Sequence, residues 1–168
     1  MATIGALQAG GHNMLAFLDT IAFSELGELI LKRSDDGYNV IVGSTPTKLI
    51  LTDHYADHPN RLIELPNLGI KSTAAGRYQI LYRFWKVYKI DLSLKDFGKV
   101  SQDRVALQLI KECKATEAIA TGNIREAVRR CKSRWASLPG AGYGQHEHKI
   151  ENLLAYYVAA GGKLAKGQ

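Results

Sequence analysis

The chain has 168 residues, of which 46% are hydrophobic and 23% are charged. These proportions are ordinary for a globular domain, and they exclude collagen-like, fibrous and fully disordered chains. No run approaches the ~18 consecutive apolar residues of a transmembrane helix, and the first residues lack the basic start of a secretory signal. We therefore expect a single domain over residues 13–163 with loose tails at 1–12 and 164–168, no membrane span and no signal peptide.

The chain is basic, with 22 Lys and Arg against 16 Asp and Glu, a net charge of +6. The excess lies in residues 80–134, which hold 13 basic and six acidic residues. Such a segment attracts polyanions, which include nucleic acid, anionic membranes and acidic cell-wall polymers. A solvated face of several helices explains the same charges, so both interpretations stay open.

The two cysteines, Cys113 and Cys131, lie within apolar helical patterns and form no C-x-x-C pair. Free cysteine is among the most buried residue types. The sequence therefore predicts two reduced core thiols of a cytosolic protein, with a disulfide as the alternative.

The first predicted element is a helix, because apolar residues recur at helical spacing from Asn13 to about Ser24. Asn13 suits the N-cap position, and Gly27 suits a helix stop. Residues 28–32 are compatible with a further helical turn, and the Asp-Asp-Gly sequence at 35–37 indicates a chain reversal.

A small β-hairpin is predicted next. Residues 38–42 are rich in β-branched side chains, and residues 49–52 can pair back onto them as a second strand. Residues 53–71 are predicted to be a loop because Pro59 and Pro66 interrupt any helix.

The rest of the chain is predicted to be helical. Further helices are expected from Ser72 to about 91–93, from Ser101 through Ile110, and over 115–121, 124–136 and 147–160, with a glycine-rich loop at 138–145. The outline is a mostly helical α+β domain with one small antiparallel β-hairpin.

Glu25 is the first candidate for chemistry, because it follows an apolar helix and stands between Phe23 and Leu26. A poorly solvated carboxyl has a raised pKa, which a general acid needs near neutral pH. The alternative is a surface glutamate at a helix C-terminus, where the helix dipole disfavours a negative charge.

Three other segments carry polar groups without a decisive motif. Residues 72–79 combine small residues with Gly76 and several donors, but they lack the lysine of a phosphate-binding loop. The 138–145 loop holds Tyr143, which could stack on a sugar or base. The His-containing runs at 53–58 and 146–148 lack zinc-site geometry, so we expect no metal and no cofactor, and hydrogen bonds to loop backbone instead.

Taken in chain order, several runs resemble the endolysin family of phage lambda. The runs are residues 22–25, 36–43, 57–59, 71–73, 76–79, 95–97, 101–103 and 135–145. The resemblance extends from about residue 14 to 162. It implies a lysozyme-like α+β fold with its small β-hairpin beside an active-site cleft.

The resemblance also implies an activity. Members of this family cleave the β-1,4 bond between N-acetylmuramic acid and N-acetylglucosamine of peptidoglycan, leave 1,6-anhydromuramic ends, and thereby lyse the host cell. They are lytic transglycosylases, and the family's catalytic glutamate aligns with Glu25. The resemblance further implies a monomer, kept in the host cytoplasm until a holin-type pore admits it to the wall, with no nucleic-acid partner.

Two mobile lips bound the family's cleft, and they map to the segment before residues 57–59 and to the 138–145 loop. We expect substrate contacts from polar or aromatic residues of the matching runs and adjoining loops. These candidates are Asn39, Tyr55, Ser72, Thr73, Tyr78, Gln79, Tyr143 and Gln145.

The sequence departs from the family where relatives can carry aspartate and this chain has Asn39, so a second catalytic carboxylate at that place is excluded. The 44–51 loop is longer than in the lambda protein, and residues 73–76 differ at the predicted helix start. A hydrolytic muramidase stays open, with its second carboxylate from Asp35, Asp36, Asp53 or Asp57. A non-catalytic basic module that binds wall or nucleic acid is the third possibility.

Overall fold

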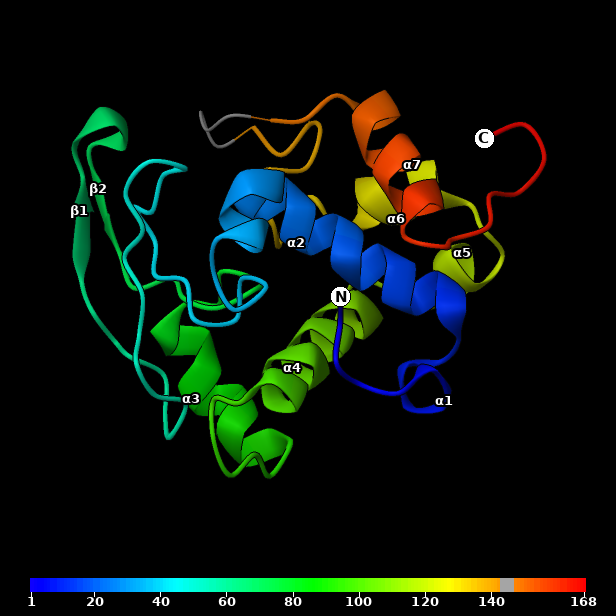
Figure 1. The fold of residues 1–168 in the computed structure, drawn as a ribbon. Helices are drawn as coiled ribbons and strands as arrows, with labels where there is room; N and C mark the ends of the chain where they lie inside the picture. The colour runs from blue at the N-terminus through cyan, green and yellow to red at the C-terminus, as the bar shows by residue number, and fades with distance from the viewer. Residues whose placement is uncertain (143–146) are drawn as a thin grey trace. The chain divides into compact units, whose positions relative to one another are not determined.

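The structure is a computed structural model that describes residues 1–142 and 147–168. Within these residues it is an α+β fold in which helices predominate (Figure 1). The elements in chain order are α1 (Ala6–Ala9), α2 (His12–Lys32), β1 (Ile63–Leu65), the 3₁₀ turn η1 (Pro66–Leu68), β2 (Ile70–Ser72), α3 (Tyr82–Asp91), α4 (Lys99–Glu112), α5 (Thr116–Ala120), α6 (Ile124–Cys131) and α7 (Ile150–Ala159).

The chain divides into two compact units. The first unit consists of residues 1–25 and 106–168, and the second consists of residues 26–105. In the first unit, α5, α6 and α7 gather beside the first part of α2 (Figure 1). The core of this unit is built from fully buried side chains of α2, α5, α6 and α7, namely Phe17, Leu18, Ile21, Ile119, Ile124, Leu153 and Tyr157.

Helix α2 begins at His12, so the prediction that Asn13 is its N-cap is wrong. The Asn13 side chain instead joins distant segments of the first unit. Its amide donates to the carbonyls of Ile119 and Ala120, both at 3.2 Å, and its oxygen accepts the N–H of Lys163 at 2.9 Å. These tertiary hydrogen bonds replace the local capping bond that the sequence favours.

The predicted interruption at Gly27 is confirmed. Its φ of 74° and ψ of 157° break the helical geometry inside α2, in a region essentially restricted to glycine. The second stretch of α2 continues to Lys32 and includes the helical turn expected at 28–32.

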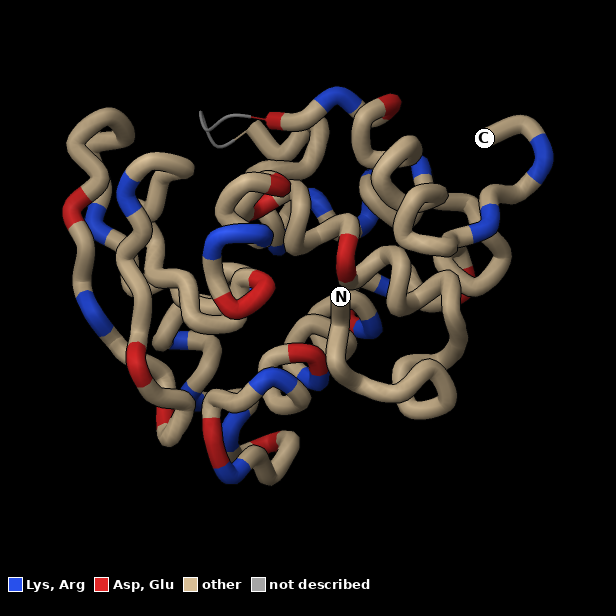
Figure 2. The backbone as a smooth tube through the Cα atoms, viewed as in Figure 1, with Lys and Arg blue, Asp and Glu red and all other residues tan. Residues whose placement is uncertain are grey.

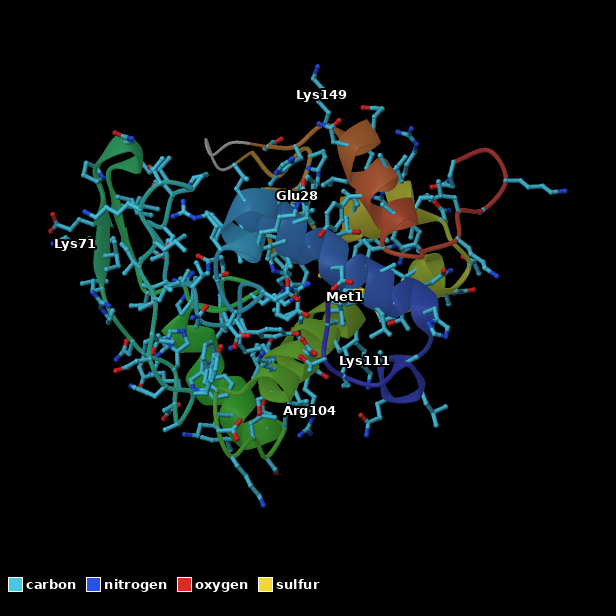
Figure 3. The ribbon with its side chains drawn as sticks, in the orientation of Figure 1. Met1, Glu28, Lys71, Arg104, Lys111 and Lys149 are labelled. Atoms are coloured by element: carbon cyan, nitrogen blue, oxygen red, sulfur yellow. The ribbon has the colours of Figure 1, made fainter. Side chains whose placement is uncertain are left out.

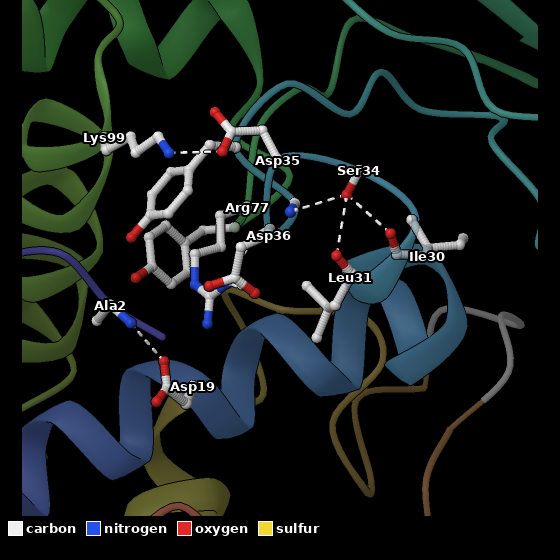
Figure 4. A network of polar contacts seen from close by, with 12 residues as sticks. Ala2, Asp19, Ile30, Leu31, Ser34, Asp35, Asp36, Arg77 and Lys99 are labelled. Carbon is white, nitrogen blue, oxygen red and sulfur yellow. Dashed lines mark hydrogen bonds and ion pairs between the residues drawn. The ribbon is translucent and has the colours of Figure 1, made fainter.

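Part of the N-terminal segment is packed, where the sequence predicts a loose tail. Residues 6–9 form α1, and the side chains of Ile4 and Ala9 are buried. The backbone N–H of Ala2 donates to the Asp19 carboxylate at 2.6 Å (Figure 4).

The regular antiparallel sheet lies inside the segment that the sequence predicts to be a loop. Strand β1 pairs with β2 in the register Ile63↔Ser72 and Leu65↔Ile70. Pro66 opens η1 between the two strands, so this proline marks the tip of a hairpin rather than a long loop. The predicted pairing of 38–42 with 49–52 is reduced to a single bridge between Val40 and Leu51.

Helix α3 begins at Tyr82, so the prediction of a helix from Ser72 is wrong. Residues 73–81 turn back on themselves, and Ala75 and Ile80 exchange two backbone hydrogen bonds of 3.0 and 2.8 Å. Gly76 has a φ of 78° and Gln79 a φ of 47°, and left-handed residues cannot propagate a right-handed helix. The predicted end of this helix near residue 91 is confirmed.

The later helices follow the prediction with shifted ends. Helix α4 begins at Lys99, and the Ser101 hydroxyl donates to Asp96 at 3.0 Å. Asn123 caps α6 by accepting the N–H of Glu126 at 3.4 Å. Helix α6 already ends at Cys131, while α5 and α7 lie within their predicted ranges.

Both cysteines are free thiols. Cys131 is buried as predicted, but Cys113 is only half-buried. A hydrogen bond with the Cys131 thiol, helped by Arg134, lowers the pKa of Cys113 to about 7. Hydrogen bonding to Cys113 and burial raise the pKa of Cys131.

Candidate active site

Glu25 lies on α2 two residues before the Gly27 break, and its side chain is half-buried. Aromatic rings pack around Phe23, two residues before Glu25 in the first unit. The Phe23 ring stacks on Tyr156 with centroids 4.2 Å apart, and the centroid of the tilted His148 ring lies 5.1 Å from that of Phe23. This part of α2 is therefore packed against α7 and the segment that leads into it.

The Glu25 carboxyl is held by one residue from a distant part of the chain. The Ser137 hydroxyl donates to Oε1 of Glu25 at 2.5 Å, and the Ser137 backbone N–H also donates to this carboxyl. The Ser24 hydroxyl in turn donates to Oγ of Ser137 at 2.8 Å. Ser24 is 5% exposed and Ser137 is 8% exposed, so both hydroxyl groups lie away from bulk water.

Burial raises the pKa of Glu25 above its ordinary value, and the two hydrogen bonds from Ser137 oppose this shift without cancelling it. Burial acts because removal of water penalises the charged carboxylate, whereas donors stabilise it. The carboxyl therefore keeps its proton to higher pH than an exposed glutamate does. This is the property that the sequence predicts for a general acid.

The segment that carries Ser137 is fixed on several sides. Its carbonyl accepts the N–H of His148 at 3.1 Å. Further along, the Glu147 carboxylate accepts the N–H groups of Gly140 and Gly142, both at 2.7 Å, and these bonds lower the pKa of Glu147. The candidates Tyr143 and Gln145 lie outside the described residues, so their place in the site stays a prediction.

The other predicted substrate contacts belong to the second unit. Asn39 and Tyr55 both bond to Asp35 there, Asn39 to its backbone and Tyr55 to its carboxylate. The Asn39 side chain accepts the N–H of Asp35 at 3.0 Å, and the Tyr55 hydroxyl donates to the Asp35 carboxylate at 2.6 Å. Lys99 completes the cluster with a 2.5 Å bond to Asp35 (Figure 4). Hydrogen bonds from Lys99 and Tyr55 lower the pKa of Asp35.

The remaining candidates line the segment that joins β2 to α3. Ser72 accepts the N–H of Ala74, Thr73 accepts the N–H of Tyr82, both at 3.2 Å, and the Gln79 amide donates to the Gly76 carbonyl at 2.9 Å. These three side chains are half-buried.

Tyr78 differs from these three, because it is only 1% exposed. Its hydroxyl donates to Asp103 at 2.6 Å, and the Tyr38 hydroxyl shares that oxygen at 2.8 Å. This burial argues against direct contact between the Tyr78 side chain and a substrate.

The carboxylates that a hydrolytic mechanism would draw on are also in the second unit, and three of them form ion pairs. Asp35 pairs with Lys99, and Asp36 pairs at 2.7 Å with the buried Arg77 (Figure 4). The Asp57 carboxylate pairs with Lys89 at 2.7 Å and accepts the Trp85 indole N–H at 2.6 Å. Burial works against the ionised form of Asp57, but these donors outweigh it and lower its pKa.

Comparison with known proteins settles the family. The profile of the Endolysin family matches residues 15–164. The chain belongs to the endolysin family. It is 52% identical to the endolysin of Escherichia phage lambda over 150 residues, which cover 89% of this chain and 91% of that protein. It is 47% identical to the endolysin of Escherichia phage P2 over 155 residues, 90% of this chain and 94% of that one.

Solved structures confirm that the endolysin has a lysozyme-like fold. Bacteriophage lambda lysozyme complexed with a chitohexasaccharide superposes with a TM-score of 0.83, at 47% identity over 98% of this chain and 99% of that one. A second structure of lambda lysozyme gives a TM-score of 0.79 at 46% identity, with the same coverage.

His58 of the endolysin makes the hydrogen bonds to loop backbone that the sequence predicts. Nε2 of His58 lies 2.8 Å from the Ile80 carbonyl, and Nδ1 accepts the N–H of Asn60 at 3.0 Å. Across residues 1–142 and 147–168, no three His, Cys, Asp or Glu side chains gather in a way that could hold a metal. In the same residues no helix of the endolysin has the length and apolar character that a bilayer span requires.

Ser24 and Ser137 are the site residues that sequence analysis missed. Both stand in runs that resemble the family, yet neither is among the predicted contacts. The sequence signal that could have identified each serine is a hydroxyl residue next to apolar residues. Their meeting across 113 positions of sequence appears only in the folded endolysin.

Proposed function

We propose that this endolysin is a peptidoglycan lytic transglycosylase in which Glu25 is the catalytic acid and base. The observation that carries the proposal is the half-buried Glu25 carboxyl with its raised pKa, held by Ser137 in a chain of the endolysin family. A relative binds a chitohexasaccharide, a chain of N-acetylglucosamine units in the β-1,4 linkage that peptidoglycan glycan strands also have. The proposed substrate class is therefore an N-acetylated β-1,4 glycan.

The reaction needs one carboxyl group. Protonated Glu25 gives its proton to the glycosidic oxygen while the bond from that oxygen to the muramic C1 breaks. The 2-acetamido group of the substrate stabilises the cationic C1. Ionised Glu25 then takes the proton of the substrate's C6 hydroxyl as O6 bonds to C1, which closes the anhydro ring and restores the acid. No water is consumed.

The intramolecular route is favoured over hydrolysis by the state of the other carboxylates. A base that activates water works best with a pKa near the working pH. Donors lower the pKa of Asp35 and of Asp57, so these two groups are weak bases. Position 39 holds an amide, which does not take up a proton at neutral pH.

Product analysis is the decisive experiment. Digestion of purified peptidoglycan is expected to yield muropeptides that end in 1,6-anhydromuramic acid, each lighter by one water than the hydrolytic product, with no new reducing ends. Mass spectrometry of the soluble products measures this difference.

Glu25→Gln keeps the side-chain volume and removes the transferable proton, so we expect it to lower the rate by about 10²–10⁴-fold while the circular dichroism spectrum is unchanged.

Each of the other outcomes would indicate a different function or mechanism for this protein. Reducing muramic ends would replace the transglycosylase by a muramidase with two carboxylates. Release of no soluble product by the unchanged protein would favour a binding module. Clearing by Glu25→Gln at the rate of the unchanged protein would remove Glu25 from the mechanism.

The same proposal includes the setting in which the endolysin acts. Because peptidoglycan lies outside the cytoplasmic membrane, an endolysin held in the host cytoplasm must cross that membrane to reach its substrate. We propose that a holin-type pore supplies this route and that the protein acts as a monomer.

A further inference from the structure

The hydrogen bonds around Glu25 run in one direction. Ser24 donates to Ser137, and Ser137 donates to Glu25. A hydroxyl group has one proton to donate, and it can accept through its lone pairs. Once Ser24 occupies the Ser137 oxygen as a donor, the Ser137 proton is directed toward Oε1 of Glu25.

Ser137 uses both of its donors on one carboxyl. Its hydroxyl and its backbone N–H both donate to Glu25. The N–H of His148 donates to the Ser137 carbonyl at 3.1 Å, so the residue that carries these donors is also held through its carbonyl group. A surface serine that met the carboxyl by chance would have none of these supports.

Burial makes these contacts effective. A hydrogen bond in a region of low dielectric is electrostatically stronger than one in water, and Ser24 and Ser137 are both buried. The Thr20 hydroxyl on the same helix is buried as well, but it donates to the Ala16 carbonyl at 2.7 Å. A buried hydroxyl of α2 is therefore satisfied by its own helix at Thr20, whereas at Ser24 it is directed to Ser137, which holds the carboxyl.

We infer that Ser24 and Ser137 form a hydroxyl relay that positions the Glu25 carboxyl and governs its two protonation states. The inference rests on the proposed role of Glu25 as acid and base. In the acid form Oε1 accepts from Ser137, so the other oxygen, Oε2, bears the proton that is transferred. In the ionised form the donated bonds stabilise the carboxylate until it takes the C6 proton. Both serines are positioning residues, since they act through Glu25.

The direct test is the titration of the Glu25 carboxyl, measured by NMR with carboxyl-labelled glutamate and assigned by the signal that Glu25→Gln removes. In Ser137→Ala the titration is expected to move to higher pH, because a donor to the charged form is lost. Ser24→Ala should move it in the same direction by less, since Ser137 keeps its hydroxyl but loses the group that orients it. Thr20→Val, which removes a buried hydroxyl from the same helix, should leave it unchanged.

Activity provides the second measurement. Ser137→Ala should lower the maximal rate about tenfold or more, as expected for a lost hydrogen bond to a charged group, and the alkaline limb of its pH–rate profile should move to higher pH. Ser137→Thr, which keeps the hydroxyl, should restore both. A merely structural role would lower the amount of folded enzyme and leave the pH profile in place.

These experiments distinguish failure of the hydroxyl relay from failure of the proposed function. An unchanged Glu25 titration in Ser24→Ala and Ser137→Ala overturns the relay even if Glu25 is essential. If Ser137→Ala does not fold, the comparison of Ser24→Ala with Thr20→Val decides alone. An active Glu25→Gln overturns the proposed function, and the titrations still report whether the serines hold the carboxyl.

Discussion

The pKa values of individual carboxyl groups in this chain are shifted in opposite directions, and the direction depends on the partners of each group. Lys99 and Tyr55 lower the pKa of Asp35, and two arginines hold the pKa of Glu126 at about 2. Glu25 receives only neutral donors from Ser137, so burial dominates and its pKa is raised. A neutral partner orients a carboxyl without fixing its charge, which suits a group that must give and regain a proton.

This shift predicts how stability depends on pH. A carboxyl whose pKa is raised on folding favours the folded state while it is protonated, and this contribution is lost as pH rises through the folded-state pKa. Glu25→Gln has no such loss. Its melting temperature should exceed that of the unchanged protein at about pH 7, and the difference should shrink toward about pH 4, near the unfolded pKa of glutamate.

Thermal denaturation at several pH values measures this difference. Glu28→Gln is the matched control, because Glu28 lies on the exposed part of α2 and pairs with Lys32 at 2.5 Å (Figure 3). That control should show no gain at neutral pH. An equal gain in both variants would show that general charge effects, and not the burial of Glu25, are responsible.

At the scale of elements, two glycines interrupt or prevent helical geometry. Gly27 breaks α2 just after the catalytic candidate, and Gly76 keeps residues 73–81 out of α3. Gly76 is required for two reasons, which are its positive φ and the lack of space for a side chain. A Cβ there would lie 2.1 Å from Oε1 of Gln102, whose amide also bonds to Arg77, Tyr38 and Phe97.

Gly76→Ala is therefore expected to be strongly destabilising. It combines left-handed strain of about 1–3 kcal/mol with displacement of the buried Gln102 amide, which leaves polar groups unsatisfied at about 1–3 kcal/mol each. Urea denaturation should show a loss of at least ~3 kcal/mol. Gly5→Ala, where a Cβ would meet nothing closer than 3.9 Å, should be nearly neutral. A loss below ~1 kcal/mol at Gly76 would contradict this account of the turn.

At the scale of the whole molecule, the net charge of +6 comes from the basic excess at residues 80–134, where acidic residues are interspersed among the basic ones. Figure 2 shows both signs along the backbone. On α6 the Glu126 carboxylate binds Arg129 and Arg130, each through a 2.6 Å bond. Arg134 pairs with Glu112 at 3.1 Å. Part of the basic segment is therefore neutralised locally, and the interpretation as a solvated face gains support from these pairs.

Binding to cell walls tests whether the basic residues of α6 that these ion pairs involve still attract anionic polymers. Arg129→Gln with Arg130→Gln should weaken binding to intact, anionic cell walls at low salt and flatten its salt dependence, because screening acts over ~10 Å at 0.1 M salt. Glu126→Gln should have the opposite effect, since it releases both arginines. Cleavage of short neutral fragments should be equal in all three proteins. Identical salt profiles in sedimentation assays would show that this face does not contact the wall.

Features that depend on local patterns and on shared motifs are predictable from the sequence. Helical periodicity predicted α2, α5, α6 and α7, and the resemblance to the endolysin family predicted the lysozyme-like fold that the solved relatives confirm. The poor solvation of Glu25 also followed from its apolar neighbours, and the raised pKa agrees with it.

Features that depend on contacts between distant segments appear only in the folded chain. The sequence predicts a loop at 63–72 because strand pairing is non-local, and the structure has a hairpin there with its proline at the turn. The sequence favours Asn13 as a cap, whereas its partners in the structure lie more than a hundred residues away. Ser137 reaches Glu25 across 112 positions, and no periodicity or spacing encodes that meeting. A local pattern specifies which residues share a face, whereas packing specifies which faces meet.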